Sequence, residues 1–465
     1  MRLILISFIS LCLAACGVPS ALRPAGEAVD IQLIENVDVL DIETGAIARG
    51  QVVRVEDGVI THVGPQGRFN GGSGASGEIH RIDARGGLII PGLIDMHVHV
   101  FDESDLAANL AYGVTTVRNL GGMPFHLPMA RQIEEGRLLG PRLITTGTIL
   151  NENGGRNTNE LQSLVSGGDA ARSEVRRQYA AGYRHLKLYS NLTRESFAAI
   201  REEAELLGMT LSGHPVEGSE TEPLDFSATL EAGFVTIEHA ESIVWFALQD
   251  DTDPERAAAL ARQMAQAGAR VTPTLIVHDN LARIVETNGA HAERPELESF
   301  SPVVRVFEQD SYDFWARYPH DDRSRMQAFY VEMTGLMHEA GVELVVGSDA
   351  GIMVTPHGIS VSQEIELLMD AGLSPLAALQ AATINPAGAL GLGEQIGRVE
   401  PGFAADFLLL PDNPLTDMSI LRSPRGVMRD GQWFDEGALA ELREASTRPS
   451  EIRTWRRVVR HVVTR

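Results

Sequence analysis

Four stretches, two near each end of the chain, alternate between apolar and polar positions, as β-strands with one buried face do. They cover residues 31–40, 51–63, 405–410 and 426–433. Asp57-Gly58 and Asp430-Gly431 interrupt the second and fourth stretches, and an Asp-Gly pair favours a two-residue hairpin turn. We expect the two ends, residues 29–87 and 394–435, to pair into one small discontinuous β domain.

Between these ends, from residue 88 to 393, short apolar strands alternate with amphipathic helical stretches such as 195–207 and 257–267. The predicted strands cover 88–100, 114–120, 142–148, 185–189, 210–214, 235–239, 271–277 and 343–347. Eight strand–helix units in series predict an α/β fold of the (β/α)8 TIM-barrel type rather than an open sheet. The connection from 279 to about 330 is too long for a turn, and we expect it to form a lid or wall over one end of the barrel.

The composition excludes some classes of protein. The chain has 465 residues, of which 44% are hydrophobic, and this is enough to build a large core. Its 63 Asp and Glu outnumber 39 Lys and Arg, and the net charge of −24 argues against a nucleic acid partner. After residue 15 no apolar run approaches the roughly 20 residues that span a bilayer.

The first 15 residues have the pattern of a secretory signal, in which Arg2 precedes an apolar run. The ending Leu13-Ala14-Ala15-Cys16-Gly17 resembles the bacterial lipobox, where the cleaved chain begins at a lipid-carrying cysteine. We expect lipidation at Cys16, a tether over 16–28, and an exported protein anchored to a bacterial membrane on its periplasmic or surface side. An ordinary signal peptide with a chance cysteine is the alternative.

The tail, 436–465, differs in charge from the acidic body. From Glu441 to Arg465 the chain has seven Arg and three Glu. We expect a terminal helix whose charges lie in solvent, and contact with anionic lipid is the alternative.

Candidate chemistry lies at the predicted strand ends. His97 and His99 close the first barrel strand, and residues two apart in a strand face the same side, so both imidazoles point together. Later strands end at Lys187, His214, His239 and Asp349. TIM-barrel active sites lie at the carboxyl ends of the strands, and unrelated histidines would need several coincidences to gather there. Because the only cysteines are Cys12 and Cys16, a metal site in the folded body must use His, carboxylate and other non-thiol ligands.

Lys187 is the only lysine among the 39 basic residues. Arg cannot lose its proton, whereas a buried Lys can become neutral and nucleophilic. A lysine inside an apolar strand therefore indicates a task that needs an amine. The alternatives are a side chain that extends to solvent and an ordinary buried ion pair.

Four further residues are candidate substrate contacts because they lie at or just past strand ends. They are Asn119, Tyr189, His278 and His357. Asn119 ends the second barrel strand and Tyr189 lies two residues past Lys187, while the two histidines follow the last two strands.

Five motifs follow one another along the chain. They are Ile90-Pro91-Gly92-Leu93-Ile94-Asp95-Met96-His97-Val98-His99, Gly213-His214-Pro215, Ile237-Glu238-His239, Gly347-Ser348-Asp349-Ala350-Gly351 and Gly397-Arg398-Val399-Glu400-Pro401-Gly402-Phe403-Ala404-Ala405-Asp406. Together they resemble the amidohydrolase superfamily, in particular its imidazolonepropionase-like and prolidase-like branch. The resemblance runs from about residue 30 to 435 and leaves out the signal region and the tail.

The resemblance implies a hydrolase with two divalent metal ions, most often zinc. By position, one ion would be held by His97, His99 and Asp349, and the other by His214 and His239. Lys187, carboxylated by CO2, would bridge both ions together with a hydroxide. Asp349 would take the proton of the hydroxide and pass it to the leaving amine.

The implied reaction is hydrolysis of an amide-type C–N bond in a small-molecule substrate, such as a peptide or an N-acyl amino acid. The same hydroxide can attack an ester or a phosphorus centre, so a lactonase or phosphotriesterase-like hydrolase is an alternative. A non-catalytic surface binding lipoprotein is the second alternative. The sequence leaves a homo-oligomer open.

Overall fold

The computed structural model describes residues 20–23, 31–68, 79–155, 158–309, 313, 317 and 320–463. The predicted signal segment 1–15 and the lipidation site Cys16 lie outside these residues. Of the predicted tether, Ser20–Leu22 (η1) and Arg23 are described. Leu22 is buried and its carbonyl accepts a hydrogen bond from the Leu139 N–H at 2.9 Å, so this part of the tether packs on the folded body.

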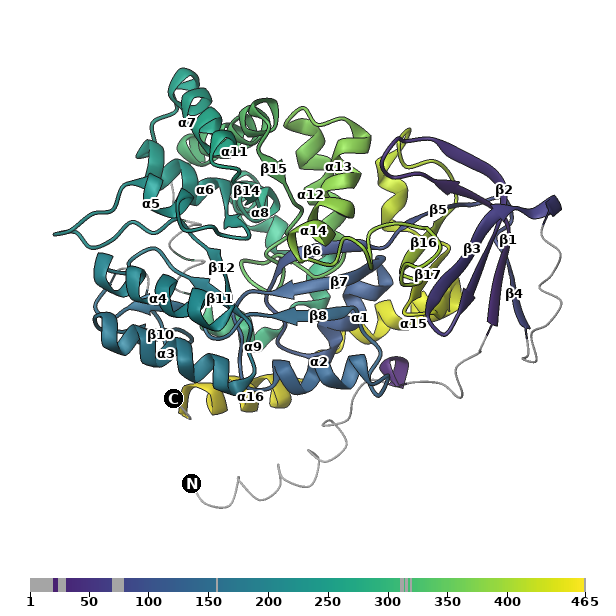
Figure 1. The fold of residues 1–465 in the computed structure, drawn as a ribbon, viewed down its shortest axis with the longest axis horizontal. Coiled ribbons are helices and arrows are strands. Elements are labelled where there is room, and N and C mark those ends of the chain that lie inside the picture. The colour runs from purple at the N-terminus through teal and green to yellow at the C-terminus, as the bar shows by residue number, and fades with distance from the viewer. Residues whose placement is uncertain are drawn as a thin grey trace, which may run out of the picture.

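Strands from both ends of the chain form one sheet, here called the flanking sheet, at the right of Figure 1. Its order is β18-β17-β16-β5-β1-β2-β3, with β4 paired to β1. The strands are β1 (Ile31–Leu40), β2 (Ile47–Glu56), β3 (Val59–Pro65), β4 (Ile79–Asp83), β5 (Leu88–Pro91), β16 (Phe407–Leu410), β17 (Gly426–Arg429) and β18 (Gln432–Asp435). Asp57-Gly58 and Asp430-Gly431 turn the β2–β3 and β17–β18 hairpins, and all four residues have positive φ, as a tight two-residue turn requires.

Parallel strands form the centre of the molecule in two sheets, ordered β6-β7-β8 and β10-β9-β11-β12-β13-β14-β15. They are β6 (Leu93–Val98), β7 (Val114–Asn119), β8 (Arg142–Thr145), β9 (Leu150–Glu152), β10 (Ser163–Val165), β11 (His185–Leu188), β12 (Thr210–Gly213), β13 (Ile237–Glu238), β14 (Arg270–Thr272) and β15 (Glu343–Leu344). Backbone hydrogen bonds join the two sheets at two places, one between the segment after β8 and β11 and one between β6 and the segment after β15. Gly147 donates to the His185 carbonyl at 3.0 Å, and Met96 donates to the Val346 carbonyl at 2.9 Å. The fold is therefore mixed α/β with parallel sheets.

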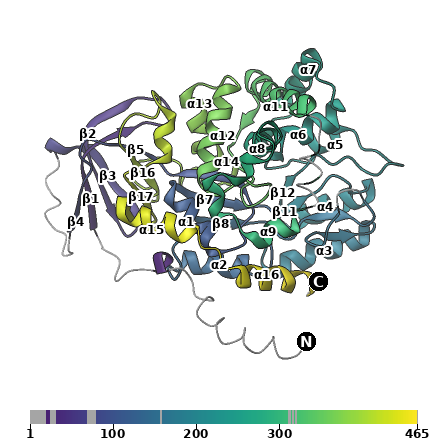
Figure 2. The same cartoon turned by 180° about the vertical axis from the view of Figure 1, so that it is seen from behind.

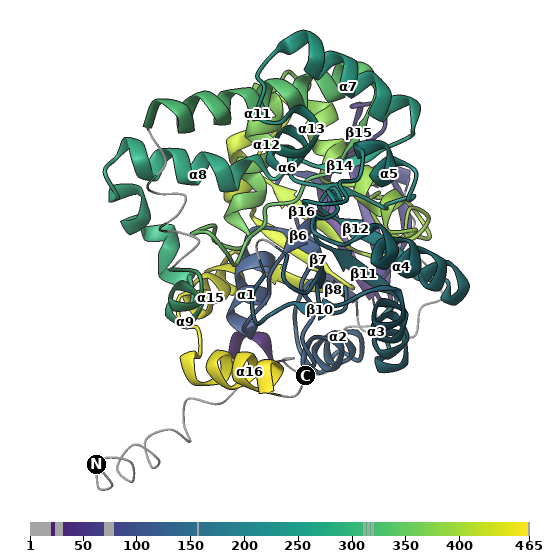
Figure 3. The same cartoon turned by 90° about the vertical axis from the view of Figure 1, so that its left-hand side faces the viewer.

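Helices surround the parallel strands (Figures 1 and 3). They are α1 (Glu103–Ala111), α2 (His126–Glu134), α3 (Gly168–Ala181), α4 (Arg194–Leu207), α5 (Phe226–Leu230), α6 (Ala240–Ile243), α7 (Pro254–Gln266), α8 (Leu275–Glu286), α9 (Pro302–Phe307), α11 (His320–Ala340), α12 (Ile359–Asp370), α13 (Pro375–Ala381), α14 (Ile384–Ala389), α15 (Glu436–Ser446) and α16 (Glu451–Val463). Short helical turns are η2 (Gln66–Arg68), η3 (Val244–Leu248), η4 (Ala290–Glu293), η5 (Pro295–Ser299) and η6 (Met418–Arg422). Within the described residues, no helix combines the length and the apolar character needed to cross a bilayer.

Two predicted strands are wrong in their extent. The run 88–100 is two strands, because the chain leaves the flanking sheet at Gly92, where a Cβ would lie 2.1 Å from the Thr115 hydroxyl. The run 271–277 ends as a strand at Thr272. Pro273 has no N–H to offer a neighbouring strand, and Thr274 has a φ of +51°, so α8 begins directly afterwards.

In the long connection after β14, the described residues 287–309 form a wall next to the loops after β6 and β15. Figure 2 shows α9, which belongs to this wall, between α8 and α16. Phe300 and Val304 of this wall pack with Phe101, Val354 and Val458 in one buried cluster. The wall therefore contacts the loops that follow β6 and β15 as well as the C-terminal helix.

The expectation that the charges of the tail lie in solvent is wrong for two arginines of its last helix, whereas Arg456 and Arg460 are exposed. Arg453 and Arg457 of α16 form ion pairs with Asp102 and Glu103 at the start of α1. Asp102 is fully buried, so these pairs lie largely away from water. A one-dimensional pattern cannot reveal such pairs, because the partners are some 350 residues apart in the chain.

Candidate metal centre

Four histidine rings follow one another at the carboxyl ends of the parallel strands. The ring centroids are 5.5 Å apart for His99 and His97, 4.7 Å for His97 and His239, and 4.6 Å for His239 and His214. Asp349 joins this group, with its Oδ1 3.0 Å from His99 Nε2 and 3.3 Å from His97 Nε2. The structure thus brings these five predicted ligands together.

Three of these residues, drawn from both of the ligand sets that the sequence suggests, are close enough to hold one ion. Ligand atoms of His97, His239 and Asp349 all lie within 4.8 Å of one another, a spacing that suits a metal ion. His97 and Asp349 come from the first set and His239 from the second. The two sets therefore adjoin, as a binuclear centre requires.

The backbone of the cluster is held in unusual conformations. His239 has a φ of +69° and Asp349 a φ of +54°, a region that residues other than glycine seldom occupy. Thr274, whose hydroxyl lies 2.7 Å from His239 Nδ1, has a φ of +51°. At Gly347 a Cβ would lie 2.9 Å from the His97 Cβ, so glycine lets the segment that carries Asp349 approach β6. Strain of this kind persists where the surrounding structure fixes it, and it gathers at functional sites.

Lys187 of β11 is buried close to the cluster. Its side chain is 1% exposed, and in the described chain its Nζ has no hydrogen-bond partner and no salt bridge. Burial lowers the pKa of His97, His214 and His239, and the positive charge of Lys187 adds to the shift. Burial lowers the pKa of Lys187 to about 8, although Glu238 and Asp349 oppose the shift. The two alternative interpretations of Lys187 are therefore wrong, because its side chain does not reach solvent and forms no ion pair in the described chain.

Glu238 and Arg118 hold His97 in place through a chain of hydrogen bonds. His97 Nδ1 donates to Glu238 at 2.9 Å, and Arg118 donates to the other oxygen of that carboxylate at 2.9 Å. Arg118 also donates to the Met96 carbonyl at 2.7 Å and to the Ser212 hydroxyl at 3.0 Å. Burial acts to raise the pKa of Glu238, but Arg118 and His97 outweigh it and hold that pKa well below its ordinary value.

The sequence interpretation gave neither Glu238 nor Arg118 a role. An arginine inside the otherwise uncharged strand β7 is as unusual as the lysine in β11, and this was the available signal. Glu238 precedes a predicted ligand, but in a strand its side chain points to the opposite face, where it meets Arg118.

The support fixes which nitrogen of His97 faces the cluster. Because Nδ1 donates its proton to Glu238, the Nε2 of the neutral ring carries a lone pair. Burial lowers the pKa of His97 to about 4, so the ring is neutral at pH 7. Its lone pair then points at an oxygen of Asp349 3.3 Å away, and a cation between the two would relieve the repulsion.

Asp95 positions the segment that carries Asp349. Its carboxylate accepts hydrogen bonds from the Ser348 N–H at 2.9 Å, from the Ser348 hydroxyl, and from the His97 N–H at 3.1 Å. Burial raises the pKa of Asp349, but His97, His99 and His239 outweigh burial and hold it well below the ordinary value. Asp349 is therefore an ionised carboxylate at neutral pH.

The four predicted substrate contacts lie in different surroundings. Tyr189 is half-buried, with its ring 4.1 Å from the ring of His214. His278, on α8, accepts a hydrogen bond from Arg323 at 2.7 Å, and His357 donates to the His99 carbonyl at 3.2 Å. The amide of Asn119 accepts from the Val100 N–H and donates to the Thr145 hydroxyl, so it braces the loop after β6.

The class of the protein follows from this geometry. Parallel strands in an α/β fold carry a buried group of imidazoles and a carboxylate at their carboxyl ends, which is where metal-dependent barrel enzymes bind their ions. Residues 88–434 match the model of the amidohydrolase family, and the chain belongs to that family. This match confirms the resemblance that the motifs suggested.

Individual relatives are distant. The ochratoxinase of Aspergillus niger is 21% identical over 408 residues, which cover 73% of this chain and 73% of that protein. Among solved structures, bottromycin amidohydrolase is similar with 25% identity, a TM-score of 0.72 and 93% of each chain covered. A Xaa-Pro dipeptidase with bound methionine has 20% identity and a TM-score of 0.68, over 87% of this chain and 100% of that one.

The family and its structural neighbours are hydrolytic enzymes that act on C–N bonds, and this chain is an amidohydrolase-type hydrolase. The family generally binds metal, and the cluster of His97, His239 and Asp349 is consistent with that property.

Glu238→Gln should weaken zinc binding about 10–100-fold, because removing the charge beneath His97 makes the imidazole a poorer ligand. Chelator competition on the folded protein measures the affinity. Glu343→Gln, which alters a more exposed ion pair with Arg270 at 2.6 Å, is the matched control and should bind zinc like the wild type. Unchanged affinity in Glu238→Gln would contradict the supporting role.

Proposed function

We propose that this chain is a metal-dependent hydrolase that cleaves an amide-type C–N bond in a peptide or an N-acyl amino acid. Lys187 carries the proposal, because it is a buried amine without a partner in the described chain and lies among the histidines and Asp349. Reaction of the neutral amine with CO2 forms an N–C bond and releases a proton. The product, a carbamate, is an anionic oxygen ligand.

The donor set suits two divalent ions such as zinc, because it offers imidazole nitrogens and carboxylate-type oxygens without a thiol. The residues that would hold the ions are His97, His99 and Asp349 for one and His214 and His239 for the other, with carboxylated Lys187 between them. The negative charges of Asp349 and the carbamate offset part of the charge of two cations. When bound, such ions supply an activated water and polarise the carbonyl of the substrate.

Asp349 is the residue placed to move the proton. It is ionised and lies within 3.3 Å of two imidazoles. In the proposed reaction its carboxylate accepts the proton of the attacking water and then gives it to the leaving nitrogen, so that the C–N bond breaks with release of a neutral amine.

Tyr189 is placed to orient the substrate. Burial, and the nearby Asp349 and Glu241, raise the pKa of its hydroxyl, which therefore stays protonated and can donate a hydrogen bond. The ring lies against His214, one of the proposed ligands.

The proposed substrate class is supported by what the similar proteins are called. One is named a Xaa-Pro dipeptidase and another an amidohydrolase of bottromycin. Both names denote cleavage of amide-type bonds, and this favours an amide over a lactone or a phosphotriester for the present chain.

We also propose that the two parallel sheets belong to one (β/α)8 barrel. In support, backbone hydrogen bonds join β6 to the segment after β15, and the backbone N–H of His99 donates to the Ala350 carbonyl at 2.7 Å. Leu88–Pro91 lie in the flanking sheet, so of the predicted range 88–393 residues 92–393 would form the barrel, and the flanking sheet would form a small β domain.

Lys187→Met should reduce the metal content from about two ions per chain to one or none, because the side chain can no longer be carboxylated. The kcat/KM for dipeptides or N-acyl amino acids should fall about 10³-fold or more, which corresponds to about 4 kcal/mol. Metal analysis and a substrate panel measure both quantities. Arg184→Met, three residues earlier and exposed, is the control.

Two results would contradict the proposal. If Lys187→Met retained its full metal content, the lysine would have no part in holding the ions. Turnover of lactones or phosphotriesters by the wild type, without turnover of any amide, would overturn the proposed substrate class.

We propose further that the protein is exported and anchored by a lipid on Cys16. The signal-like segment and the lipobox-like sequence support this localisation, and a lipid chain attaches a protein without a spanning helix. The described chain begins at Ser20, four residues past the cysteine, so such an anchor would hold the folded body close to the bilayer.

Cys16→Ser should move the protein from the membrane fraction to the soluble fraction of a bacterial host, because the lipid acceptor is lost. Cys12→Ser, within the same signal segment, should leave the distribution unchanged. Immunodetection after ultracentrifugation measures the distribution. A wild-type protein in the soluble fraction would contradict the anchor.

A further inference from the structure

The C-terminal helix α16 lies beyond the residues that match the family model, yet it is tied to the site. Arg453 donates to both oxygens of Asp102 at 2.6 and 2.7 Å and contacts Glu103 at 2.6 Å. Arg457 donates to both oxygens of Glu103 at 2.6 and 3.1 Å and to the Phe101 carbonyl at 3.0 Å. Paired arginine–carboxylate forks of this kind fix geometry as well as charge.

Asp102 and Glu103 lie at the end of the loop that follows His97 and His99, here called the His99 loop (residues 99–103). Residues 99–103 lead from His99 directly into α1, and Asp102 caps that helix by accepting a hydrogen bond from the Ser104 N–H. The distance along the chain from His99 to the two acidic residues is therefore three or four residues.

The other groups of this loop are also fixed. The Val100 N–H donates to Asn119, and the Val100 carbonyl accepts from His126 at 2.7 Å. The Phe101 N–H donates to Asp105 at 2.7 Å. The guanidinium of Arg457 also lies 4.3 Å from the ring of Phe125, so the same arginine contacts the residue that precedes His126.

The loop needs positive charge that its own neighbours do not provide. Asp102, Glu103 and Asp105 are all buried within four positions of the chain. Burial and the negative charges of Asp102 and Glu103 raise the pKa of Asp105 to about 7. Arg453 and Arg457 supply the compensating charge, and without them two buried carboxylates would be left unpaired.

The same helix reaches the loop on the other side of the site. Trp455 stacks on Phe307 of α9, with centroids 5.6 Å apart, and the next residue, Glu308, accepts a hydrogen bond from the Met353 N–H at 2.8 Å. Met353 lies four residues after Asp349. Helix α16 thus contacts the loop after His99 directly, and it contacts the loop after Asp349 indirectly, by way of Phe307 and Glu308.

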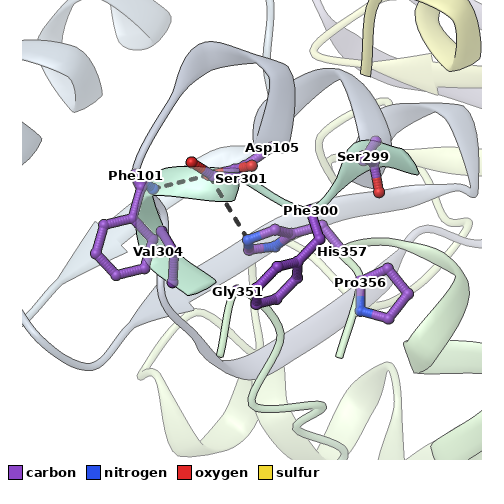
Figure 4. A pocket seen from close by; sticks show the side chains of 10 residues that line it. Phe101, Asp105, Ser299, Phe300, Ser301, Val304, Gly351, Pro356 and His357 are labelled. Atoms are coloured by element: carbon purple, nitrogen blue, oxygen red, sulfur yellow. Dashed lines mark hydrogen bonds and ion pairs between the residues drawn. The ribbon is translucent and has the colours of Figure 1, made fainter. Parts of the chain in front are cut away.

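A pocket lies where these parts meet (Figure 4). It is lined by residues that include Phe101, Asp105, Val304, Gly351 and His357, from the loop after β6, helix α1, the wall and the loop after β15. His357 lies 3.7 Å from the Asp105 carboxylate and donates to the His99 carbonyl at 3.2 Å. Displacement of the loop after β6 would therefore act on His99 itself.

We propose that Arg453 and Arg457 are positioning residues for the metal centre, and that α16 holds the His99 loop in the conformation that binds metal and substrate. This inference rests on the proposed function. The two arginines act through Asp102 and Glu103 and touch no ligand directly.

The test compares zinc affinity, kcat and KM in the full chain with Cys16→Ser, so that every variant is soluble. Arg457→Met should weaken zinc binding about 10–100-fold and lower kcat more than it raises KM, because His99 is displaced. Arg457→Lys keeps the charge but not the fork, and its affinity should lie between those of the wild type and Arg457→Met.

A matched control separates positioning from general stability. Arg176 of α3 makes the same two-bond fork with buried Glu203 of α4, at 2.8 and 2.8 Å, away from the site. Arg176 is more exposed than Arg457, so the melting temperature of each variant is measured as well; Arg176→Met should lower it without changing zinc affinity or kcat. In the double variant Arg457→Met, Glu103→Gln the zinc affinity should recover in part, because Glu103 no longer carries the buried charge that Arg457 helps to offset.

The outcomes are distinct. Arg457→Met with wild-type zinc affinity and kcat would overturn the positioning role, and so would equal losses in Arg176→Met. If Arg457→Met does not fold, Arg457→Lys and the double variant decide the question in the same way. A wild-type protein that binds no zinc and cleaves no amide would instead refute the proposed function, and this is established before any variant is compared.

Discussion

Lys187 places an amine with no hydrogen-bond partner in the described chain close enough to three imidazoles and the Asp349 carboxylate for their charges to interact. An unpaired buried ammonium costs several kcal/mol, and a protein avoids that cost by neutralising the group or by giving it a partner. Neutralisation makes the amine a nucleophile, and carboxylation by CO2 gives it the charge to hold cations. The remainder of the site is arranged around this one side chain, because its neighbours are ligands for the ions that a carbamate would bridge.

Such a centre needs a rigid frame. Arg118 and Glu238 fix His97 from below, Asp95 fixes the segment of Asp349, and the left-handed backbone at His239 and Asp349 is held by its neighbours. These buried charges and strained residues reduce stability locally. The large apolar core shared by the helices and the flanking sheet offsets that cost, so the site can retain conformations that a small domain could not support.

Much of this arrangement could be predicted from the sequence because short-range periodicity encodes it. Alternation of strand and helix located the strand ends, and ligands at those ends followed from the geometry of parallel strands. The strand end at Thr272 was missed because Pro273 and the left-handed Thr274 act locally against an apolar run. Arg118, and the pairs of Arg453 and Arg457 with the start of α1, were missed because they depend on contacts between distant parts of the chain.

We propose that one site holds two ions, with a modified Lys187 between them. Anomalous X-ray diffraction at the zinc absorption edge, on crystals of the wild-type protein, would locate them. Two anomalous peaks about 3.5–4 Å apart are expected, with electron density for a carbamate that continues from Lys187 Nζ between them. A single peak beside an unmodified lysine would contradict it.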